Sequence, residues 1–437
     1  MIKSKTNMKI HGWGCYPKIN AEILYPESLS DCQKNIKNNL LIARGNGRSY
    51  GDSANANIIL STNFLKKIIN FDKKNGLLTV ETGITINEIL NLIVPNGWFL
   101  PVTPGTSYAT IGGIIASDAH GKNHSNRGTI SEYVNSISLI LGTGDIVTIS
   151  KSELPELFQA TCGGMGLTGM IVSATIKLIP IASTLIDNVT IKANSLEEIL
   201  KTFEENTNCE YSLAWVDSFA AKKNIGRGLV FLGNHNKENL LQYKFSDPIN
   251  IPSAIPKFFL NNFGIKFFNA IYFNIKKDKK NKTNIPDFFY TLDKLKNWNK
   301  FYGKNGFIQY QFVIPKLNGC TNLKKILTQI NNSGTNSFLS VLKKFGKKND
   351  NLLSFPIEGY SFALDFKLST KAINLLRNLD NTVIDMGGKI YLAKDALMSE
   401  EIFKKMYPSW ENFESIRLKY GAIGKFSSKQ SLRLGLL

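Results

Sequence analysis

Between residues 40 and 180 the chain alternates short runs of β-branched and other apolar residues with glycine-rich turns. This pattern predicts four strands, at Leu77–Thr82, Val134–Leu141, Ile146–Ser150 and Met170–Leu178. Apolar residues at helical spacing predict helices at Thr85–Val94 and Ser152–Thr161. A mixture of this kind indicates an α+β domain.

After Pro180 the pattern changes. Longer segments of alternating apolar and polar residues, such as Gly306–Val313 and Tyr360–Lys367, predict a second domain built on an antiparallel sheet. Residues 251–285 differ from their surroundings, because aromatic residues, Ile and Leu interleave there with lysine. Two interpretations of this segment stay open: a mobile insertion with some core aromatics, or an amphipathic flap that touches a membrane or a lipid tail.

The composition indicates the number of domains and the net charge of the chain. The 437 residues are 43% hydrophobic and 20% charged, which is typical of a folded chain of two or three domains. Lys and Arg exceed Asp and Glu by 53 − 34 = 19, and such an excess favours anionic partners. We expect no nucleic-acid binding, because the chain has no arginine-rich arm and no regularly spaced basic helix.

The cysteines and the lengths of the apolar runs indicate the cellular compartment of the protein. Five cysteines are scattered without a CxxC pair, which argues against a disulfide framework and suits a reducing compartment. The first residues are basic without an apolar signal region, and no run reaches the roughly 18–20 apolar residues of a spanning helix. We therefore expect a cytoplasmic protein, with peripheral contact to the inner membrane through residues 251–285 as an open alternative.

The first of three glycine-rich segments is ARGNGRSYGDS, which follows the apolar residues 40–42. Its glycines let successive backbone N–H groups turn toward an anion, and Arg44 and Arg48 add positive charge. The segment therefore indicates a cradle for a pyrophosphate, although a plain surface turn has a similar composition.

The second segment, residues 101–128, reads PVTPGTSYATIGGIIASDAHGKNHSNRG. Small residues dominate it, so we expect no ordinary amphipathic helix but a backbone that closely approaches a large flat ligand. A metal site of Asp118, His120 and His124 is disfavoured, because Gly and Asn interrupt the regular helix that such a pair of histidines needs. We expect no metal, and a purely structural loop histidine stays an alternative for His120.

The third segment, Gly163–Gly169, contains a literal GxGxxG. A dinucleotide-binding Rossmann motif requires a strand before these glycines and a helix after them. Here a helical pattern precedes them and the strand-like MIVSATIKL follows. We therefore reject a Rossmann site and expect a tight turn that lies against the same ligand.

Together these segments resemble the vanillyl-alcohol-oxidase-type flavoproteins with a PCMH-type FAD-binding domain. Within that superfamily the chain is most similar to the decaprenylphosphoryl-β-D-ribose 2′-oxidase family, over nearly its whole length. The strings that carry the resemblance, in chain order, are ARG-x-x-RSYGD, PGT followed by TIGG, HGKNH, GG-x-GLTG, SLAWVD, QYQFVIP, SFPIEGY, YLAKD and MYP.

The resemblance implies an α+β flavoprotein of two domains. Its FAD-binding domain would comprise residues 1–183 and be completed by the C-terminal segment 389–437, with a substrate-binding domain at 184–388. FAD would be held noncovalently, since Asn46 and Gly47 stand where covalent relatives carry the attaching residue. The residues that match FAD-binding positions are Ala43, Arg44, Gly45, Asn46, Gly47, Arg48, Ser49, Tyr50, Gly51, Asp52, Ser53, Gly105, Thr110, Ile111, Gly112, Gly113, Ser117, Asp118, Ala119, His120, Ile171 and Tyr391.

The resemblance also implies the catalytic and substrate-binding residues. Lys394 matches a lysine that lies over the flavin, where a cation orients the alcohol for hydride transfer. His120 is the second catalytic candidate, as a group that positions the alcohol. The residues that match the substrate pocket are Lys122, Gln309, Gln311, Lys343 and Lys394, with Lys122 and Lys343 as phosphate partners.

We therefore expect FAD-dependent oxidation of the C2 hydroxyl of a polyprenylphosphoryl-β-D-ribose to the 2-keto sugar. In the family this is the first half of an epimerisation to the arabinose form in cell-envelope glycan synthesis. The implied partners are a short-chain NAD(P)H-dependent reductase that acts on the product, and a quinone or another electron acceptor. Alternatives are an FAD-dependent oxidase or dehydrogenase of a soluble polyol, aldonolactone or other sugar, and a flavin-free scaffold for membrane glycan assembly.

Overall fold

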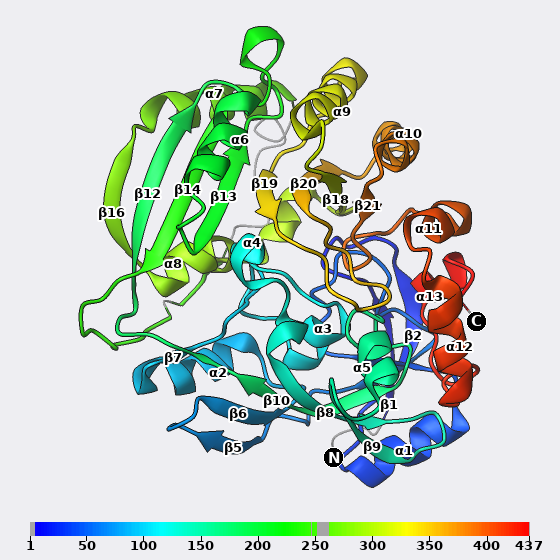
Figure 1. Cartoon of the computed structure of the whole chain (residues 1–437). Helices are drawn as coiled ribbons and strands as arrows, with labels where there is room; N and C mark the ends of the chain where they lie inside the picture. The colour runs from blue at the N-terminus through cyan, green and yellow to red at the C-terminus, as the bar shows by residue number, and fades with distance from the viewer. Residues whose placement is uncertain (1–4, 246, 251–261, 437) are drawn as a thin grey trace.

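A computed structural model describes residues 5–245, 247–250 and 262–436. Within these ranges the N-terminal part of the chain builds two sheets, and the part after Pro180 builds a larger one (Figure 1). Helices lie between the strands in both parts. The predicted α+β class, with an antiparallel sheet in the second part, is confirmed.

The N-terminal part begins with a sheet of mixed strand direction. Its strands in spatial order are β1 (Lys5–Ile10), β2 (Ile19–Leu24), β4 (Ile58–Ser61) and β3 (Ile42–Arg44). The next sheet is antiparallel, and its strands are β5 (Ile68–Asp72), β6 (Leu77–Glu81), β10 (Met170–Lys177), β8 (Val134–Ile140) and β9 (Ile146–Ile149). The first glycine-rich segment leaves the carboxyl end of β3, which pairs in parallel with β4.

The elements predicted for this part are present. The four predicted strands correspond to β6, β8, β9 and β10, and the predicted helices correspond to α2 (Ile86–Ile93) and α5 (Pro155–Thr161). Helix α5 begins later than the predicted Ser152, because Leu154 has a left-handed backbone and Pro155 takes the first helical position. Since α5 precedes the third glycine-rich segment and β10 follows it, the rejection of a Rossmann motif is confirmed.

The second glycine-rich segment departs from expectation, because it contains α3 (Ile111–Ala116) and α4 (His124–Arg127). The Thr110 hydroxyl caps α3 by accepting a hydrogen bond from the amide of Gly113. The isoleucines of α3 are buried, whereas its glycines line a cavity. The two sides of α3 therefore differ in the size of their side chains and not in polarity. A search for alternating polar and apolar residues does not detect such a helix.

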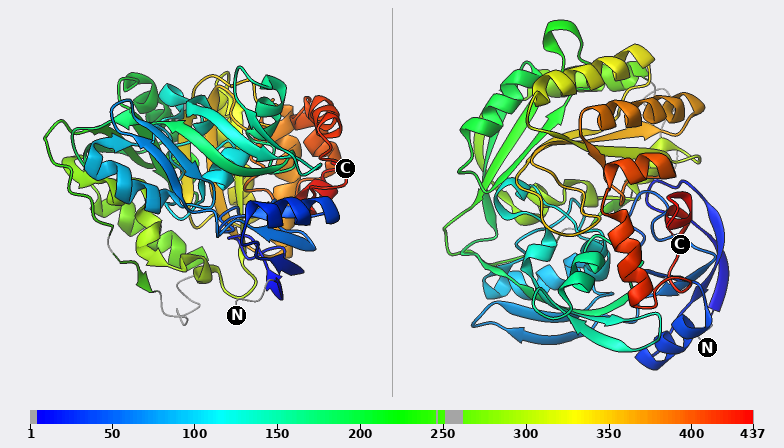
Figure 2. Two further views of the ribbon diagram at one scale, coloured as in Figure 1. Left: turned by 90° about the horizontal axis from the view of Figure 1, so that it is seen from below. Right: turned by 45° about the vertical axis from the view of Figure 1, so that its right-hand side comes forward.

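The described residues of the second part form an eight-stranded antiparallel sheet. Its strands in spatial order are β16 (Lys279–Asn284), β12 (Leu185–Ala193), β14 (Gly228–His235), β13 (Tyr211–Val216), β19 (Ser340–Phe345), β20 (Gly359–Lys367), β18 (Phe307–Pro315) and β21 (Lys389–Ile390). One face is covered by α6 (Leu196–Glu205), α9 (Gly319–Ser333) and α10 (Thr370–Asp385), as Figure 2 (right) shows. The other face is turned toward the N-terminal part.

Shorter elements connect these sheets. The paired strands are β7 (Trp98–Phe99) with β11 (Ile179–Pro180), and β15 (Ile249–Asn250) with β17 (Leu295–Lys296). The remaining helices before the C-terminal segment are α1 (Leu29–Asn38), α7 (Asn262–Ile275) and α8 (Ile285–Phe289), with 3-10 turns at Val94–Asn96, Ile130–Tyr133, Lys222–Asn224, Thr291–Lys294 and Trp298–Tyr302. None of the helices in the described ranges is both long and apolar enough to cross a membrane.

The C-terminal segment returns to the N-terminal part. Its helices are α11 (Glu400–Met406), α12 (Trp410–Lys419) and α13 (Lys429–Arg433). They lie beside the N-terminal strands (Figures 1 and 2), and the backbone of Leu41 bonds to Lys425 and Ser427. We propose the functional division 1–183, 184–388 and 389–437, with β21 as a short shared strand at the last boundary.

Arg433 links the C-terminal segment to the N-terminal part. Its Nη2 donates to Asp52 Oδ1 (2.7 Å) and to Asp395 Oδ2 (2.9 Å), and both carboxylates are almost fully buried. Asp52 belongs to the first glycine-rich segment, and Asp395 directly follows Lys394. One guanidinium therefore pairs with two buried carboxylates that come from opposite ends of the chain.

Arg433→Ala should lower the free energy of unfolding by about 3 kcal/mol or more, because it leaves two buried carboxylates unpaired. The exposed pair of Lys405 with Glu401 supplies the control, and Lys405→Ala should cause no measurable change. Urea unfolding of both variants checks the difference. Equal stability of the two variants would contradict the role given to Arg433.

Candidate active site

A cavity of about 900 Å³ lies between the N-terminal part and the inner face of the eight-stranded sheet. One wall consists of residues from all three glycine-rich segments. The opposite wall consists of alternate residues of neighbouring strands, because successive strand residues point to opposite faces. These residues are Leu213 and Trp215, Gln309 and Gln311, Val341 and Lys343, and Ser361 and Ala363.

The first glycine-rich segment presents unbonded backbone amides to the cavity. Within the part of the chain that the structure describes, the amides of Asn46, Gly47, Arg48 and Ser49 donate no hydrogen bond. A Cβ at Gly45 would come within 2.3 Å of Thr110 Oγ1, so a glycine is needed for this loop to lie against the start of α3. Free amides on a loop beside small residues suit the binding of a pyrophosphate.

The two arginines of this segment have different positions. The guanidinium of Arg44 donates to the carbonyls of His11 (2.7 Å) and Ala54 (2.9 Å) and lies outside the cavity lining. Arg48 lines the cavity, with its guanidinium carbon 4.3 Å from the Trp13 ring centroid and 5.0 Å from that of Tyr108. Its buried Nε has no partner among the described residues. Of the two arginines, only Arg48 therefore adds charge to the cavity.

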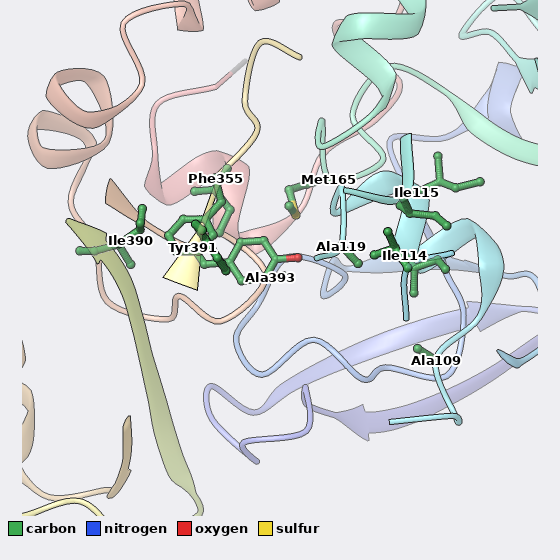
Figure 3. Close-up of a cluster of buried hydrophobic side chains, with 14 of the residues drawn as sticks. Ala109, Ile114, Ile115, Ala119, Met165, Phe355, Ile390, Tyr391 and Ala393 are labelled. Carbon is green, nitrogen blue, oxygen red and sulfur yellow. The ribbon is translucent and has the colours of Figure 1, made fainter. Parts of the chain in front are cut away.

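Tyr391 lines the cavity, and the ring of Phe355 packs against it. Tyr391 and Phe355 are stacked at 4.8 Å, and the Tyr391 hydroxyl donates to the carbonyl of Ser117 (2.9 Å). Figure 3 shows this hydroxyl directed toward the side on which Ala119 and Met165 lie. Ala119, Met165 and Tyr391 all line the cavity, so this part of it is apolar and suits a planar ring system.

His120 lies in the cavity wall beside these rings. Its Nε2 is 2.9 Å from Gln311 Nε2, which also donates to Ser361 Oγ (3.1 Å). Because an amide nitrogen is a donor, His120 Nε2 accepts this bond and Nδ1 carries the proton. Burial, together with the positive charge of Lys343, holds the pKa of His120 well below its usual value. His120 is therefore a neutral imidazole whose accepting nitrogen is already occupied.

Lys394 comes into the cavity because two loops dock on each other. The amide of Tyr50 donates to the carbonyl of Ala393 (3.0 Å), and a Cβ at Gly51 would overlap the carbonyl of Asp395. This contact places Lys394 Nζ 3.8 Å from the ring centroid of Tyr50. Burial lowers the pKa of Lys394 to about 7.

Two further lysines share the cavity. Lys343 Nζ has no carboxylate and no hydrogen-bond partner within the described ranges, and burial lowers its pKa to about 8. Lys122 Nζ donates to the carbonyl of Phe288 and lies over that residue's ring, at 4.6 Å. Burial and the charge of Lys343 lower the pKa of Lys122 to about 7. An anion bound among these groups would relieve their mutual repulsion.

Asp365 was missed by sequence reasoning. The pairing of β18 with β20 sets it beside Gln309, whose Nε2 donates to Asp365 Oδ1 (2.7 Å). The Tyr302 hydroxyl donates to Asp365 Oδ2 (3.2 Å). Burial raises the pKa of Asp365 to about 7, and its negative charge raises that of Lys394. Its position on the same strand face as Ser361 and Ala363 was the available signal.

The structure brings most of the residues expected from the sequence into the cavity wall. Those that line it are Ala43, Gly45, Asn46, Gly47, Arg48, Ser49, Tyr50, Ser53, Gly105, Thr110, Gly112, Gly113, Ser117, Ala119, His120, Lys122, Ile171, Gln309, Gln311, Lys343, Tyr391 and Lys394.

Five expected residues lie outside the lining, each for a local reason. Arg44, Gly51 and Asp52 are held by the contacts given above, and Ile111 is turned into the core. Asp118 Oδ2 accepts from Ser354 Oγ (2.6 Å) and from the side-chain amides of Asn349 and Asn351. These five residues hold the neighbouring lining residues in place and do not themselves face the cavity.

Sequence reasoning also missed residues that distant elements supply. Asp293 accepts bonds from the Ser107 amide (2.6 Å), the Ser107 hydroxyl and the Thr106 hydroxyl, which ties residues 291–294 to the second glycine-rich segment. Trp13 and Trp215 line the cavity from opposite parts of the chain. Trp215 belongs to the string SLAWVD, but nothing in that string marks it as a cavity residue, and no motif marks Trp13 or Asp293.

Comparison with known proteins agrees with this geometry. Residues 23–150 match the family model of the FAD binding domain. The chain is 32% identical to the decaprenylphosphoryl-beta-D-ribose oxidase of Mycolicibacterium smegmatis, over 99% of this chain and 98% of that protein. It is 28% identical to the D-arabinono-1,4-lactone oxidase of Eremothecium gossypii over 37% of this chain and 32% of that protein. It is 29% identical to the D-lactate dehydrogenase of Anaerostipes hadrus over 34% of this chain and 32% of that protein.

The fold and the site define an FAD-dependent oxidoreductase of the vanillyl-alcohol-oxidase type. Within this class the chain belongs to the decaprenylphosphoryl-beta-D-ribose oxidase family, whose Mycolicibacterium member it matches from end to end.

The residues of the cavity fit FAD. The free amides of residues 46–49 and the guanidinium of Arg48 would hold the pyrophosphate, and the apolar part of the cavity at Tyr391 would receive the ring system. A Cβ at Gly105 would meet no atom within 4 Å, so this glycine leaves open space in the cavity wall. When bound, FAD supplies the acceptor for a hydride from the substrate.

Gly105→Val should leave the thermal unfolding of the FAD-free protein unchanged, because a Cβ at this position has no atom within 4 Å. It should weaken FAD binding tenfold or more, since the side chain takes space that the cofactor needs. Flavin absorbance per protein and titration of the FAD-free form with FAD check this outcome. Full FAD occupancy in the variant would show that the cofactor does not pass Gly105.

Proposed function

We propose that this protein oxidises the C2 hydroxyl of a polyprenylphosphoryl-β-D-ribose to the 2-keto sugar, with FAD bound noncovalently. The observation that carries the proposal is the pair of buried lysines Lys122 and Lys343, which share one cavity with the side-chain amides of Gln309 and Gln311. A phosphate requires cations, and sugar hydroxyls require fixed amide partners. The name of the Mycolicibacterium relative supports the same substrate.

Lys343 is the best-placed phosphate partner. Its charge lowers the pKa of Lys122, of Lys394 and of His120, so it lies close enough to all three to influence them. It also has no carboxylate partner of its own in the described residues. A phosphate bound beside Lys343 would attract the positive charges that otherwise repel one another in the cavity.

Lys394 is the proton acceptor in this proposal. An alcohol that gives up a hydride must also give up its hydroxyl proton. Because the pKa of Lys394 is about 7, a large fraction of its amine is unprotonated near neutral pH and able to take this proton. His120 orients the alcohol instead, since its accepting nitrogen already bonds to Gln311.

The product defines the partners of the reaction. A 2-keto sugar on a polyprenyl phosphate is a substrate for a short-chain NAD(P)H-dependent reductase, which completes the epimerisation to arabinose for cell-envelope glycans. The electrons leave to a quinone or another acceptor. The second candidate function is oxidation of a soluble polyol, aldonolactone or other sugar, which the similarity to the D-arabinono-1,4-lactone oxidase favours.

Lys343→Met should raise the KM for the polyprenylphosphoryl sugar tenfold or more and change kcat little, because one charged hydrogen bond to phosphate is lost. Lys344→Met is the matched control, since the next residue on β19 points to the other face and pairs with Glu204. Steady-state kinetics with the lipid-linked and the free sugar check both variants. Equal turnover of the two sugars by the wild-type protein would favour the soluble substrate.

The pH dependence tests the proton acceptor. For the wild-type protein, kcat/KM should fall as the pH drops below about 7, because Lys394 becomes protonated. Asp365→Asn removes a negative charge that raises the pKa of Lys394, so this acid limb should move to lower pH by on the order of one unit.

Asp380→Asn is the control for this profile. Asp380 is also buried, also accepts from a tyrosine hydroxyl, and has its pKa raised to about 7 by burial, but its charge is not among those that shift the pKa of Lys394. Its replacement should leave the acid limb in place. An acid limb that stays fixed in Asp365→Asn, or that persists in Lys394→Met, would remove Lys394 from this role.

A further inference from the structure

Helix α7 presents a stripe of large apolar side chains to solvent. Phe263, Phe267, Ile271 and Ile275 follow one another at intervals of four residues, and Phe268 lies beside them. All five are exposed, with 80% of Phe263 accessible. Residues four apart lie on the same side of a helix, so these side chains form one continuous face. We call this face the α7 stripe.

The opposite side of α7 holds the helix in place. Ile265 and Phe273 are buried, and the buried side-chain amide of Asn269 donates to Asp217 Oδ1 (2.9 Å). The guanidinium of Arg227 lies 4.7 Å from the ring centroid of Phe273. The helix runs along the outside of the molecule (Figure 2, left). The α7 stripe is therefore exposed because the packed side of α7 fixes its direction.

The charges around the stripe are positive. The exposed lysines on α7 and immediately after it are Lys266, Lys276, Lys277, Lys279 and Lys280. The acidic residue among them, Asp278, accepts a hydrogen bond from the backbone amide of Lys192. A helix with aromatic and aliphatic residues on one face and lysines at its edge has the composition of helices that bind anionic membrane surfaces.

The stripe is continuous with the active-site cavity. Phe268 stacks on Tyr272, with 5.9 Å between ring centroids, and Tyr272 contacts Trp215 edge to face at 4.9 Å. Tyr272 and Trp215 both line the cavity. An apolar path of aromatic rings therefore leads from the exposed surface of α7 to the cavity where the chemistry takes place.

We propose that the α7 stripe docks on the surface of an anionic lipid bilayer and so holds the cavity at that surface. The apolar side chains enter the boundary between headgroups and acyl chains, and the neighbouring lysines contact the headgroups. Docking goes beyond the proposed reaction and does not require that the substrate be lipid-linked. Residues 251–261, the first part of the segment that the sequence marked as an amphipathic flap, lie outside the described residues and are not part of the argument.

Co-sedimentation of the flavin-loaded full chain with vesicles, without substrate, tests the docking. The protein should bind vesicles of equal parts phosphatidylglycerol and phosphatidylcholine, and bind phosphatidylcholine alone more weakly. Phe263→Ser combined with Phe267→Ser should reduce binding tenfold or more, since two large apolar side chains no longer enter the bilayer. High salt should weaken binding to the anionic vesicles, because it screens the lysines.

The control replaces apolar residues of similar exposure elsewhere. Leu317→Ser combined with Leu418→Ser should leave vesicle binding unchanged, since Leu317 is also 80% exposed but lies far along the chain from α7. Flavin content and melting temperature of both double variants show whether each is folded. Substrate turnover is measured separately, so a failure of docking and a failure of the proposed reaction are distinguishable.

Three results would overturn the proposal. One is that the wild-type protein does not sediment with anionic vesicles, and another is that the α7 double variant sediments as well as the control. The third is that light scattering shows a dimer that Phe263→Ser with Phe267→Ser converts to a monomer, which would make the stripe a contact between two copies of this chain.

Discussion

The active site depends on the contact between the loop at Tyr50 and the loop at Lys394. The bond from the Tyr50 amide to the Ala393 carbonyl allows almost no separation between them, and Gly51 fits against Asp395 only because it has no side chain. Arg433 then forms ion pairs with Asp52 and Asp395, one carboxylate from each loop. The segment that leaves β3 with free amides and the segment that carries Lys394 are therefore held as one unit, although about 340 residues separate them in the chain.

This unit supports an electrostatic arrangement that would otherwise be unfavourable. Lys122, Lys343 and Lys394 share one cavity with a neutral histidine, and burial depresses the pKa of each lysine. In the unfolded chain these lysines would be fully protonated at neutral pH, so folding releases protons from them at a cost in stability. Proteins tend to accept such a cost at functional sites, where a lysine that is neutral near pH 7 is useful. Burial lowers the pKa of Lys394, and the negative charge of Asp365 limits this decrease.

The sequence allowed the strands and helices of the N-terminal part to be predicted, because their apolar periodicity is regular. It also indicated that the three glycine-rich segments share a ligand, and all three line the cavity. It did not distinguish Arg44 from Arg48, since two arginines in one loop have the same composition and only the fold decides which faces the cavity. Asp365 escaped notice because its partner Gln309 is set by strand register, which no local pattern shows.

The two walls of the cavity come from different parts of the chain, and this difference affects substrate specificity. The match to the FAD binding domain ends at residue 150, whereas Gln311, Lys343 and Ala363 come from the sheet of the second part. Matches to the lactone oxidase and the lactate dehydrogenase cover about a third of the chain, while the match to the ribose oxidase covers nearly all of it. Cofactor chemistry is thus common to a broad class of enzymes, and the choice of substrate falls to a sheet that presents alternate side chains to the cofactor wall. A change of substrate within this fold therefore requires only new residues at the inward positions of a few strands, because the outward positions hold the helices that keep the sheet in place.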